Sequence, residues 1–592
     1  MKKQSTLKRA LALGMSATMV GATLAGCGGS ASSTAATSTE TASSAATEAE
    51  TTTDSDKPFA GTTLTWYTTL NGNVSDNYAN LGDTPWAKYV QERTGITIEF
   101  QHPTQGSEAE EFAVMLASGE YPDIIEYTWT TYSGGAGAAI NDGVIISLDD
   151  YMADATNLSK VMQEHPEIGK MIKSSGGNYY CFPCLRGLES PNKTEFSSGF
   201  LYRADALADL GFDQVPETID EWEEVLRAAK AAGYSKPFTT RKEWVKDVWS
   251  AAYDNWGSFY VDDGVVKNGL MEDSRKDFIQ KMADWYAEGL LDNDWMQADK
   301  KSTQTDFVSG NCILGYAPFG QGLGNYTKAM MEADPNFKEE YIQAAAPVTS
   351  TKGKNAKFSK MNNIYDQSGA SAAISSQCKN VEAAVWLLDW LYSEEGQICY
   401  NFGIEGESYE MKDGKPVYTD LILNNPDGMS VAQALAAYTR ASTSGAGIQS
   451  EDYIDQYYAQ DNQKKALELS MKTDMGEHMF PPTSVSEENQ DRYSEIMSQV
   501  KTLADEMEAS FICGTTPMSE WDSYQQKLKD AGKICYSVGY NIDMLSTAPT
   551  AALTSATNVW SVCYKELIEG AQNGSIPQNW CKGYEDGAVA IT

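Results

Sequence analysis

Histidine is scarce in this chain of 592 residues, which contains three widely separated copies: His102, His165 and His478. Their spacing excludes the patterns typical of zinc-binding helices and zinc fingers. The sequence also lacks a G-x-S-x-G nucleophile elbow, a Walker P-loop and a complete G-x-G-x-x-G motif; the nearest approach is Gly320–Gly324. Carboxylates are abundant, but abundance does not identify a glycosidase pair. We therefore expect a binding protein without a metal or cofactor, not an enzyme.

Positive charge is also in short supply, with 45 Lys and Arg against 82 Asp and Glu and a net charge of −37. A chain so acidic repels nucleic acid and anionic lipid, which leaves a neutral or cationic molecule or another protein as the expected partner. No apolar run beyond the N-terminal region is long enough to span a bilayer. The length exceeds what one hydrophobic core supports, so we expect at least two lobes in a monomeric protein.

The N-terminal region has the layout of an export signal. Lysines and an arginine precede an apolar run from Ala10 to Leu24, and the run ends in "LAGC" at Cys27. This motif resembles the bacterial lipobox, which predicts a signal peptide at 1–26 and acylation of Cys27; a chance match within a small-residue cleavage region is the alternative. Residues 27–58 are rich in Ser, Thr and Ala and predict a flexible tether, about 30 Å from end to end. The folded part would then lie on the extracytoplasmic face of the cell membrane, anchored by lipid.

After the tether, strand and helix patterns alternate. Strands are predicted at "TTLTWY", "ITIEF" and "PDIIEY", and a helix at "TPWAKYVQERTG", with Thr84 as N-cap and Gly95 as its end. Capping boxes are predicted at Ser107-x-x-Glu110 and Thr218-x-x-Glu221. This order of elements predicts a mainly parallel α/β lobe.

Aromatic residues are plentiful, with 14 Trp and 32 Tyr. Several gather in Tyr127–Tyr132, Lys242–Tyr260 and Gly315–Gly324. Flat rings cover the C–H faces of sugars while amides and carboxylates bind the hydroxyls, so these segments favour a carbohydrate ligand. Burial of the same rings in the core is the alternative for each of them.

Five segments together resemble extracellular solute-binding proteins of family 1, and more narrowly the large Gram-positive lipoproteins associated with oligosaccharide uptake. They include "LASGEYPDII" (Leu116–Ile125), "FVSGNCILGY" (Phe307–Tyr316) and, most specifically, "SEEGQICYNFGIEGESYE" (Ser393–Glu410). The resemblance extends from about Phe59 to Gly532. It implies an α/β fold of two lobes, like type II periplasmic binding proteins, with a hinge and a ligand cleft between them.

The resemblance also implies domain limits and partners. Lobe I would comprise 59–185 and about 345–425, lobe II 186–344 and about 426–534, and 535–592 would be an atypical tail. The ligand would be an oligosaccharide, delivered to the permease subunits of an ABC importer when the lobes close around it.

Candidate ligand-binding residues follow from the position of each motif. Tyr127 and Trp129 come after the "PDII" strand, and Tyr316 and Phe319 come after "SGNCILG". Loops expected to face the cleft supply the remaining candidates: Trp66, Tyr67, Asn71, Trp249 and Trp256.

Two segments depart from the family pattern. Many of these lipoproteins carry an acidic, EF-hand-like loop after the helix that contains "DEW", but this chain reads "AAGYSKPF" there, so no calcium site is expected. The tail is similar instead to the end of basic membrane protein family lipoproteins, although a lysine common after "LTS" is missing. It is either a packing appendage or a junction between two unrelated genes.

The stretch "NYYCFPC" (Asn178–Cys184) suggests a redox or metal site, because Cys181 and Cys184 form a C-x-x-C pair. Pro183 favours extended chain where a redox helix would begin, and further zinc ligands are missing, so packing in a hinge strand is the preferred interpretation. An extracytoplasmic thiol-disulfide enzyme and a surface glycan-binding protein without a transporter remain the alternative functions.

Overall fold

The computed structural model describes residues 57–365, 371–443, 445–481 and 485–532, and three short tail strands, β15 (Val538–Tyr540), β16 (Thr554–Asn558) and β17 (Val589–Ile591). The predicted signal peptide, Cys27, nearly all of the tether and most of the tail lie outside the described residues. Within these ranges, no helix has both the length and the apolar character that crossing a membrane requires.

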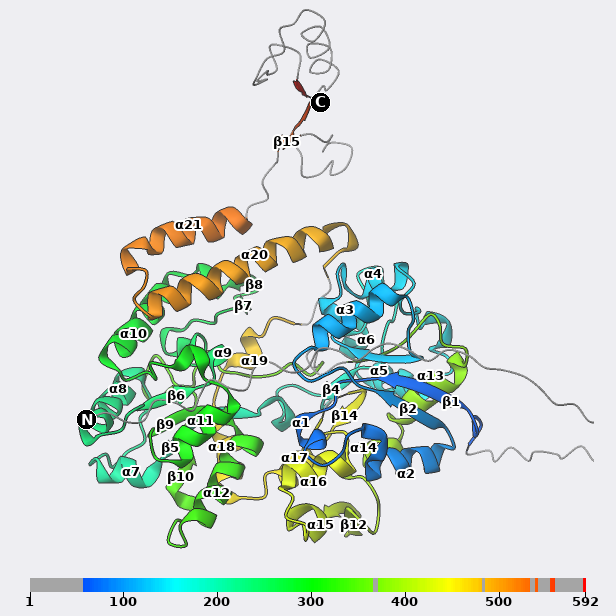
Figure 1. The fold of residues 1–592 in the computed structure, drawn as a ribbon, viewed down its shortest axis with the longest axis horizontal. Helices are drawn as coiled ribbons and strands as arrows, with labels where there is room; N and C mark the ends of the chain where they lie inside the picture. The colour runs from blue at the N-terminus through cyan, green and yellow to red at the C-terminus, as the bar shows by residue number, and fades with distance from the viewer. Residues whose placement is uncertain are drawn as a thin grey trace, which may run out of the picture. The chain divides into compact units, whose positions relative to one another are not determined.

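Lobe I is built on a sheet with the strand order β11-β3-β1-β2 (Figure 1). Strand β1 (Thr63–Tyr67) runs parallel to β2 (Thr97–Gln101) and β3 (Ile124–Tyr127), and β11 (Ser371–Ile374) joins antiparallel to β3. The first helices along the chain are α1 (Gly72–Ser75), α2 (Pro85–Thr94), α3 (Glu108–Ser118), α4 (Gly135–Asn141), α5 (Thr156–Glu164) and α6 (Pro166–Met171). After β11 come α13 (Val381–Trp390), α14 (Glu394–Phe402), β12 (Tyr409–Lys412), β13 (Lys415–Tyr418), α15 (Asp420–Leu423) and α16 (Val431–Tyr438).

Lobe II is built on a second sheet with the order β10-β5-β9-β6. Its strands are β5 (Ser198–Arg203), β6 (Phe238–Thr240), β9 (Leu314–Pro318) and β10 (Ile342–Ala344), and β6 runs parallel to β9 whereas the other pairs are antiparallel. The elements between these strands are α7 (Ala204–Asp209), α8 (Ile219–Ala232), α9 (Lys242–Val245), β7 (Phe259–Asp262), β8 (Val265–Asn268), α10 (Asp273–Glu288), α11 (Lys300–Val308) and α12 (Asn325–Ala333). Later helices are α17 (Glu451–Tyr457), α18 (Asp461–Ser470), α19 (Met475–His478), α20 (Glu487–Ile512) and α21 (Trp521–Gly532).

Several predicted helix ends are confirmed. The hydroxyl of Thr84 accepts a hydrogen bond from the Ala87 amide, Pro85 opens α2, and Gly95 ends it in the left-handed conformation. The capping box of α8 is present, with the side chains of Thr218 and Glu221 bonded to each other's backbone amides. Each of these signals depends on neighbouring residues only, which is why sequence was enough to find them.

The capping box predicted at Ser107 is wrong. Ser107 has φ −123° and ψ 20°, and its side chain makes no capping hydrogen bond to α3. The carboxylate of Glu108 instead accepts the amide of Gly106 at 2.9 Å. The turn before α3 is therefore bonded to Glu108, and the Ser107-x-x-Glu110 sequence does not form a capping box.

Two crossover segments of the described chain pair as strands. Strand β4 (Cys184–Arg186), leaving lobe I, runs parallel to β14 (Gly447–Gln449), which leads from α16 towards α17. The extended chain predicted at Pro183 is therefore confirmed. Gly447 has φ 143°, and a Cβ there would lie 2.4 Å from the ring of Tyr400, so this crossover requires glycine.

The packing of α16 bears on the predicted domain limits. This helix contacts α1 and α2, and Ala436, Ala446 and Ile448 belong to the same core cluster as strands β1 to β3. Part of the chain from about 426 to β14 therefore packs with lobe I, whereas Ala434, Leu435 and Ala441 belong to the cluster that also contains strands of lobe II. We propose β14 as the boundary, and the other predicted limits stay predictions.

Candidate functional site

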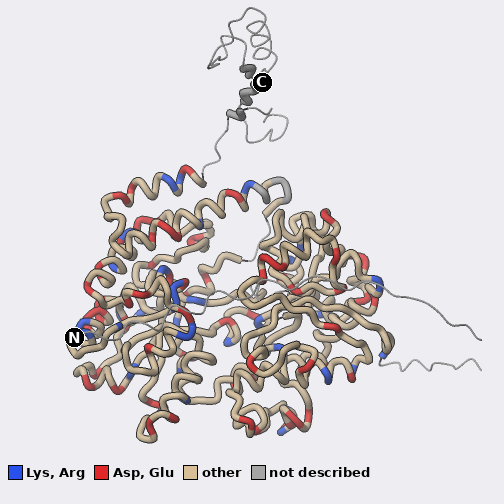
Figure 2. Tube along the Cα trace, viewed as in Figure 1, with Lys and Arg blue, Asp and Glu red and all other residues tan. Residues whose placement is uncertain are grey.

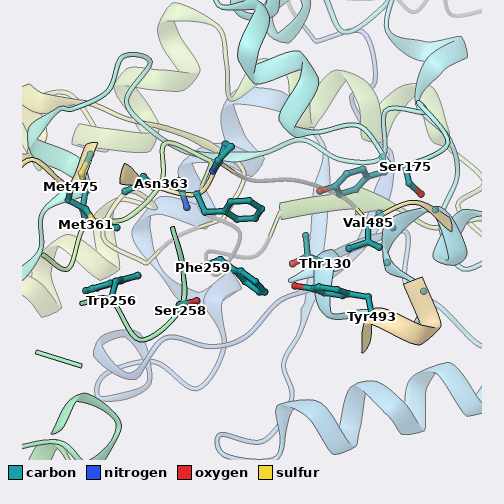
Figure 3. Close-up of a pocket in the computed structure, with 18 residues that line it drawn as sticks. Thr130, Ser175, Trp256, Ser258, Phe259, Met361, Asn363, Met475, Val485 and Tyr493 are labelled. Atoms are coloured by element: carbon teal, nitrogen blue, oxygen red, sulfur yellow. The ribbon is translucent and has the colours of Figure 1, made fainter. Parts of the chain in front are cut away.

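A cavity of about 430 Å³ lies between the lobes, and we call it the interlobe cavity. Lobe I contributes Thr130, Gly134 to Gly137, Ser175 and Tyr180, and lobe II contributes Trp256, Ser258, Phe259 and Tyr493. The connecting segments add Met361, Asn363, Met475, Met479, Phe480, Pro481 and Val485. Figure 3 shows Trp256, Met361 and Asn363 towards one end and Thr130, Ser175 and Tyr493 towards the other, with Phe259 between them.

Local structure explains how lobe I presents its wall. Thr130 lies in the helical turn Trp129–Thr131 that follows β3, and the next helix, α4, begins after Gly134 in the left-handed conformation. The glycines and small residues of α4 bring its backbone to the cavity surface. The opposite wall is aromatic, with the rings of Trp256 and Phe259 from the segment that enters β7. A wall of backbone and hydroxyls facing a wall of rings suits a flat, hydroxylated ligand.

A second cavity of about 130 Å³ lies in lobe II, and we call it the Trp244 cavity. Its lining includes Trp244, Asp247, Tyr316 and Lys360. Trp256 lines both cavities. The two spaces therefore meet at one indole ring, and a ligand longer than one sugar unit has two adjoining places to occupy.

Two of the predicted residues lie at these cavities. Trp256 lines both of them, and Tyr316 lines the Trp244 cavity with its ring edge-on to Trp244 at 5.4 Å. Both remain in the proposed site.

The candidates near β1 and β3 line neither cavity. Trp129 is 2% exposed and donates its indole N–H to the carbonyl of Ser371 at 3.0 Å. The ring of Tyr127 stacks on Phe112, with centroids 3.6 Å apart. The loop after β3 does reach the interlobe cavity, but through Thr130 and α4.

The first strand and its loop serve the fold of lobe I. Trp66 is buried in the core, and burial raises the pKa of Tyr67 to about 12. The side chain of Asn71 caps α1 by accepting the amide of Asn73 at 2.9 Å. None of the three residues lines either cavity.

Trp249 and Phe319 are enclosed in the cores of lobe II. Trp249 is fully buried, with Phe200 and Trp285 at centroid distances of 4.4 and 4.9 Å, and Phe319 is 1% exposed. A ligand cannot reach either ring in this conformation, so we no longer include them in the site. Burial in the core, which is the alternative interpretation of each aromatic residue, describes both Trp249 and Phe319.

Sequence reasoning missed most of the actual lining. Trp244 lies within the same quoted segment as Trp249 and Trp256, and aromatic content alone did not separate the three. Asn363 and Lys360 come from the segment that returns to lobe I, where no motif marked them. Their position depends on how the lobes are joined.

The cysteine pair is inaccessible. Cys181 and Cys184 are both 0% exposed, and burial raises the pKa of the Cys181 thiol to about 12. A redox nucleophile requires an accessible thiol with a low pKa, so this environment disfavours the thiol-disulfide function. Among the residues that the structure describes, no three His, Cys, Asp or Glu side chains are grouped to hold a metal ion.

Comparison with known families decides the classification. Residues 75–398, more than half of the chain, match the family model of the bacterial extracellular solute-binding protein. The chain belongs to this family. The family consists of substrate-binding proteins of ABC importers and not of enzymes, and its members are extracellular.

Curated relatives agree with this placement. Lipoprotein LipO of Bacillus subtilis is 26% identical over 378 residues, which cover 60% of this chain and 70% of LipO. The fructooligosaccharide ABC transporter substrate-binding protein FusA of Streptococcus pneumoniae is 23% identical over 475 residues, covering 75% of this chain and 83% of FusA.

Solved structures confirm the predicted two-lobe α/β fold. The alginate-binding protein AlgQ2, solved without calcium ion, superposes with a TM-score of 0.66 at 23% identity, covering 80% of this chain and 96% of AlgQ2. A solute-binding protein associated with a transporter of HMO from Bifidobacterium longum infantis gives 0.62 at 18% identity, covering 80% and 96%.

Proposed function

We propose that this solute-binding protein captures an oligosaccharide between its lobes and delivers it to the permease subunits of an ABC importer. Acylated Cys27 and the tether at 27–58 would hold it on the extracytoplasmic face of the membrane. The observation that carries the ligand class is the interlobe cavity, which combines the rings of Trp256 and Phe259 with hydrogen-bonding groups such as Asn363. The sugars named for FusA and for the transporter of Bifidobacterium longum infantis support the same class.

Delivery follows from a two-state view of the lobes. A sugar that contacts both walls binds the closed arrangement better than an open one, so it shifts the population towards closure. The importer can then recognise the closed state. Because the cavity takes residues from lobe I, lobe II and the connecting segments, one bound ligand can couple all three.

Binding is tested by isothermal titration calorimetry of the full-length, detergent-solubilised protein against neutral and acidic oligosaccharides. We expect at least one sugar to bind. Trp256→Ala should weaken it by tenfold or more, because sugar stacking on an indole that lines both cavities is lost. Tyr341→Ala, a partly exposed ring outside either cavity, is the matched control. Binding of a peptide or nucleoside with no sugar bound would refute the ligand class.

The role in import is tested separately in cells. Deleting the gene should abolish growth on the bound sugar while leaving growth on glucose unchanged. Unimpaired uptake of that sugar in the deletion strain would instead favour the alternative of a surface glycan-binding protein.

The thiol-disulfide alternative makes a different prediction. A catalytic pair would be alkylated rapidly at neutral pH, whereas we expect Cys181 to react with iodoacetamide only when the protein is unfolded, because its thiol is buried. Mass spectrometry of alkylated peptides from native and denatured protein measures both rates, and rapid labelling of the native protein would support the enzyme.

A further inference from the structure

The Trp244 cavity has an unusual concentration of positive charge beside an aromatic ring. The guanidinium carbon of Arg241 lies 4.7 Å from the ring centroid of Trp244, and the ammonium of Lys360 lies 4.3 Å from the same centroid. Arg241 is the N-cap residue of α9, whereas Lys360 belongs to the segment that returns to lobe I. Two cations from separate parts of the chain thus converge on one indole.

A third cation extends this group towards lobe I. Lys300 opens α11, and its pKa is lowered by burial and by the nearby charge of Arg241, while Asp76 at the end of α1 acts in the opposite sense. Figure 2 shows blue segments gathered around α9 and the start of α11 on a chain that is otherwise dominated by red. We call Arg241, Lys300 and Lys360 the cationic cluster.

The cations of the cluster have no described carboxylate at salt-bridge distance, although Asp76, Glu243 and Asp247 act on them from farther away. Neighbouring cations are paired in the usual way, for example Lys246 with Asp505. Because acidic residues outnumber basic ones by 82 to 45, an unpaired group of cations is unexpected in this chain.

Nearby acids are insufficient or engaged elsewhere. The carboxylate of Asp247 lies 3.7 Å from the guanidinium of Arg275. Asp247 and Glu243 both raise the pKa of Lys360, yet burial and Arg241 outweigh them, so that pKa is lowered. Like charges held together next to a cavity cost free energy when the cavity is empty, and an anion in that cavity relieves the cost.

We propose that the ligand is an acidic oligosaccharide, whose negative group binds at the cationic cluster while its ring stacks on the aromatic residues of the Trp244 cavity. The inference rests on the proposed function, because it specifies the sugar class at the same site. A planar carboxylate matches the fork of the Arg241 guanidinium, and the ammonium of Lys360 adds a point charge. Tyr316 and Trp256 supply further aromatic surface in the same lining.

The first experiment needs no variant. A glycan array is probed with the full-length, detergent-solubilised protein, using uronate oligosaccharides from pectin, alginate and glycosaminoglycans, each beside its carboxyl-reduced, neutral form. Sulfated oligosaccharides and their desulfated forms are the second arm. We expect the bound glycans to be acidic, with affinity at least tenfold above that of the neutralised partner and falling as salt concentration rises.

Substitutions in the cationic cluster then test whether its charges account for the preference for acidic sugars. Arg241→Gln and Lys360→Gln should each reduce the ratio of acidic to neutral affinity by tenfold or more. Lys412→Gln, on the exposed hairpin of β12 and β13, should leave the ratio unchanged. Thermal melts of each variant establish that the fold is retained.

The outcomes separate the two proposals. Binding of neutral sugars with no gain from an acidic group, or binding that survives neutralisation and both substitutions, would overturn the acidic ligand and leave the sugar-binding function intact. Absence of binding to every glycan would overturn the proposed function itself. Loss of binding on carboxyl reduction would identify a uronate, and loss on desulfation a sulfated sugar.

Discussion

Glu195 is a buried carboxyl group beside the hinge. Its side chain accepts hydrogen bonds from the Asn192 amide at 2.8 Å and the Ser190 hydroxyl at 3.0 Å, and Arg186 of β4 lies nearby. Burial outweighs these contacts and raises its pKa to about 7 from the ordinary 4.5. A group at the crossover between the lobes therefore changes charge near neutral pH.

This shift predicts how stability depends on pH. Between pH 4.5 and 7 the unfolded state has lost the proton of Glu195 while the folded state retains it, so the free energy of unfolding falls as pH rises. The total contribution is about 3 kcal/mol for a shift of this size. We expect Glu195→Gln to remove that decline in urea titrations performed from pH 4 to 8.

Glu189 provides the matched control for this prediction, because it is an exposed glutamate of the same loop. Glu189→Gln should keep the decline of the wild-type protein. An equally steep decline in Glu195→Gln would assign the pH dependence to other groups.

At the scale of single residues, sequence found the right segments more often than the right side chains. The segment Lys242–Tyr260 was selected for its tryptophans, and it does form part of both cavities. Trp249 nevertheless lies in the core, whereas Trp244 lines a cavity between two cations. Residue type does not reveal which ring faces inward, because that depends on the packing of distant strands.

Helix α20 is held to lobe II by a buried ion pair. The carboxylate of Glu508 accepts two hydrogen bonds from the guanidinium of Arg275 on α10, at 2.9 and 2.7 Å, and both side chains are 1% exposed. The hydroxyl of Tyr524 on α21 donates to the same carboxylate at 3.3 Å. One acid thus connects three helices.

Breaking this pair should destabilise lobe II strongly. Glu508→Ala leaves the buried Arg275 charge with only the longer contact to Asp247 at 3.7 Å. We expect a loss of about 3 kcal/mol in the free energy of unfolding, measured by urea titration. Glu506→Ala, an exposed acid on the same helix, should change it by less than about 0.5 kcal/mol. Equal effects of the two substitutions would contradict the role of the pair.

A lysine occupies the segment after α8 where many relatives of this type were expected to carry an acidic calcium loop. The ammonium of Lys236 lies 3.1 Å from carboxylates of both Asp292 and Asp306, and 3.7 Å from that of Asp294. The positive charge that this group of acids needs therefore comes from the chain itself.

Folding should consequently be independent of calcium. We expect neither Ca²⁺ nor EDTA to shift the melting temperature, whereas Lys236→Met should cost about 1–3 kcal/mol because it leaves buried acids unpaired. Lys328→Met, which removes an exposed pair with Glu332, is the control. A rise in melting temperature of the wild-type protein on adding Ca²⁺ would contradict this account.

Short sequence motifs predicted helix ends correctly at some positions and incorrectly where a neighbouring residue made the hydrogen bond instead. The caps of α2 and α8 were found from short motifs, because each motif contains both partners of the hydrogen bond. The capping box predicted at Ser107 is wrong, because Ser107 makes no capping hydrogen bond and the Glu108 carboxylate accepts the Gly106 amide of the preceding turn. The contacts of α16 with α1 and α2 join positions far apart in the sequence, so a local motif could not indicate them.

At the scale of the whole molecule, net charge and local charge point to different classes of ligand. A charge of −37 favours a neutral or cationic partner, whereas Arg241 and Lys360 place positive charge against the ring of Trp244, which lines the Trp244 cavity. Charge summed over a chain describes long-range repulsion, whereas recognition depends on the few groups at the site. Composition alone could not locate those groups.

A ligand bound between the lobes should protect both of them. At about 100 times its dissociation constant it adds about 2.7 kcal/mol to the free energy of unfolding. We expect hydrogen exchange to slow in α4 of lobe I and in β7 of lobe II, because each lies next to the interlobe cavity. Exchange measured by mass spectrometry that slowed in one lobe alone would contradict a site between them.

The edge strand β11 carries a consequence for the order of folding. It pairs with β3 across the stretch that contains all four strands of the lobe II sheet, since Ser371 lies opposite Tyr127. Lobe II has its four strands within one continuous stretch, so its sheet can form while lobe I still lacks an edge. Strand β3 is made well before β11, so its edge stays unpaired until the later residues are available. We expect the pairing of β11 with β3 to be the slow step in the folding of lobe I.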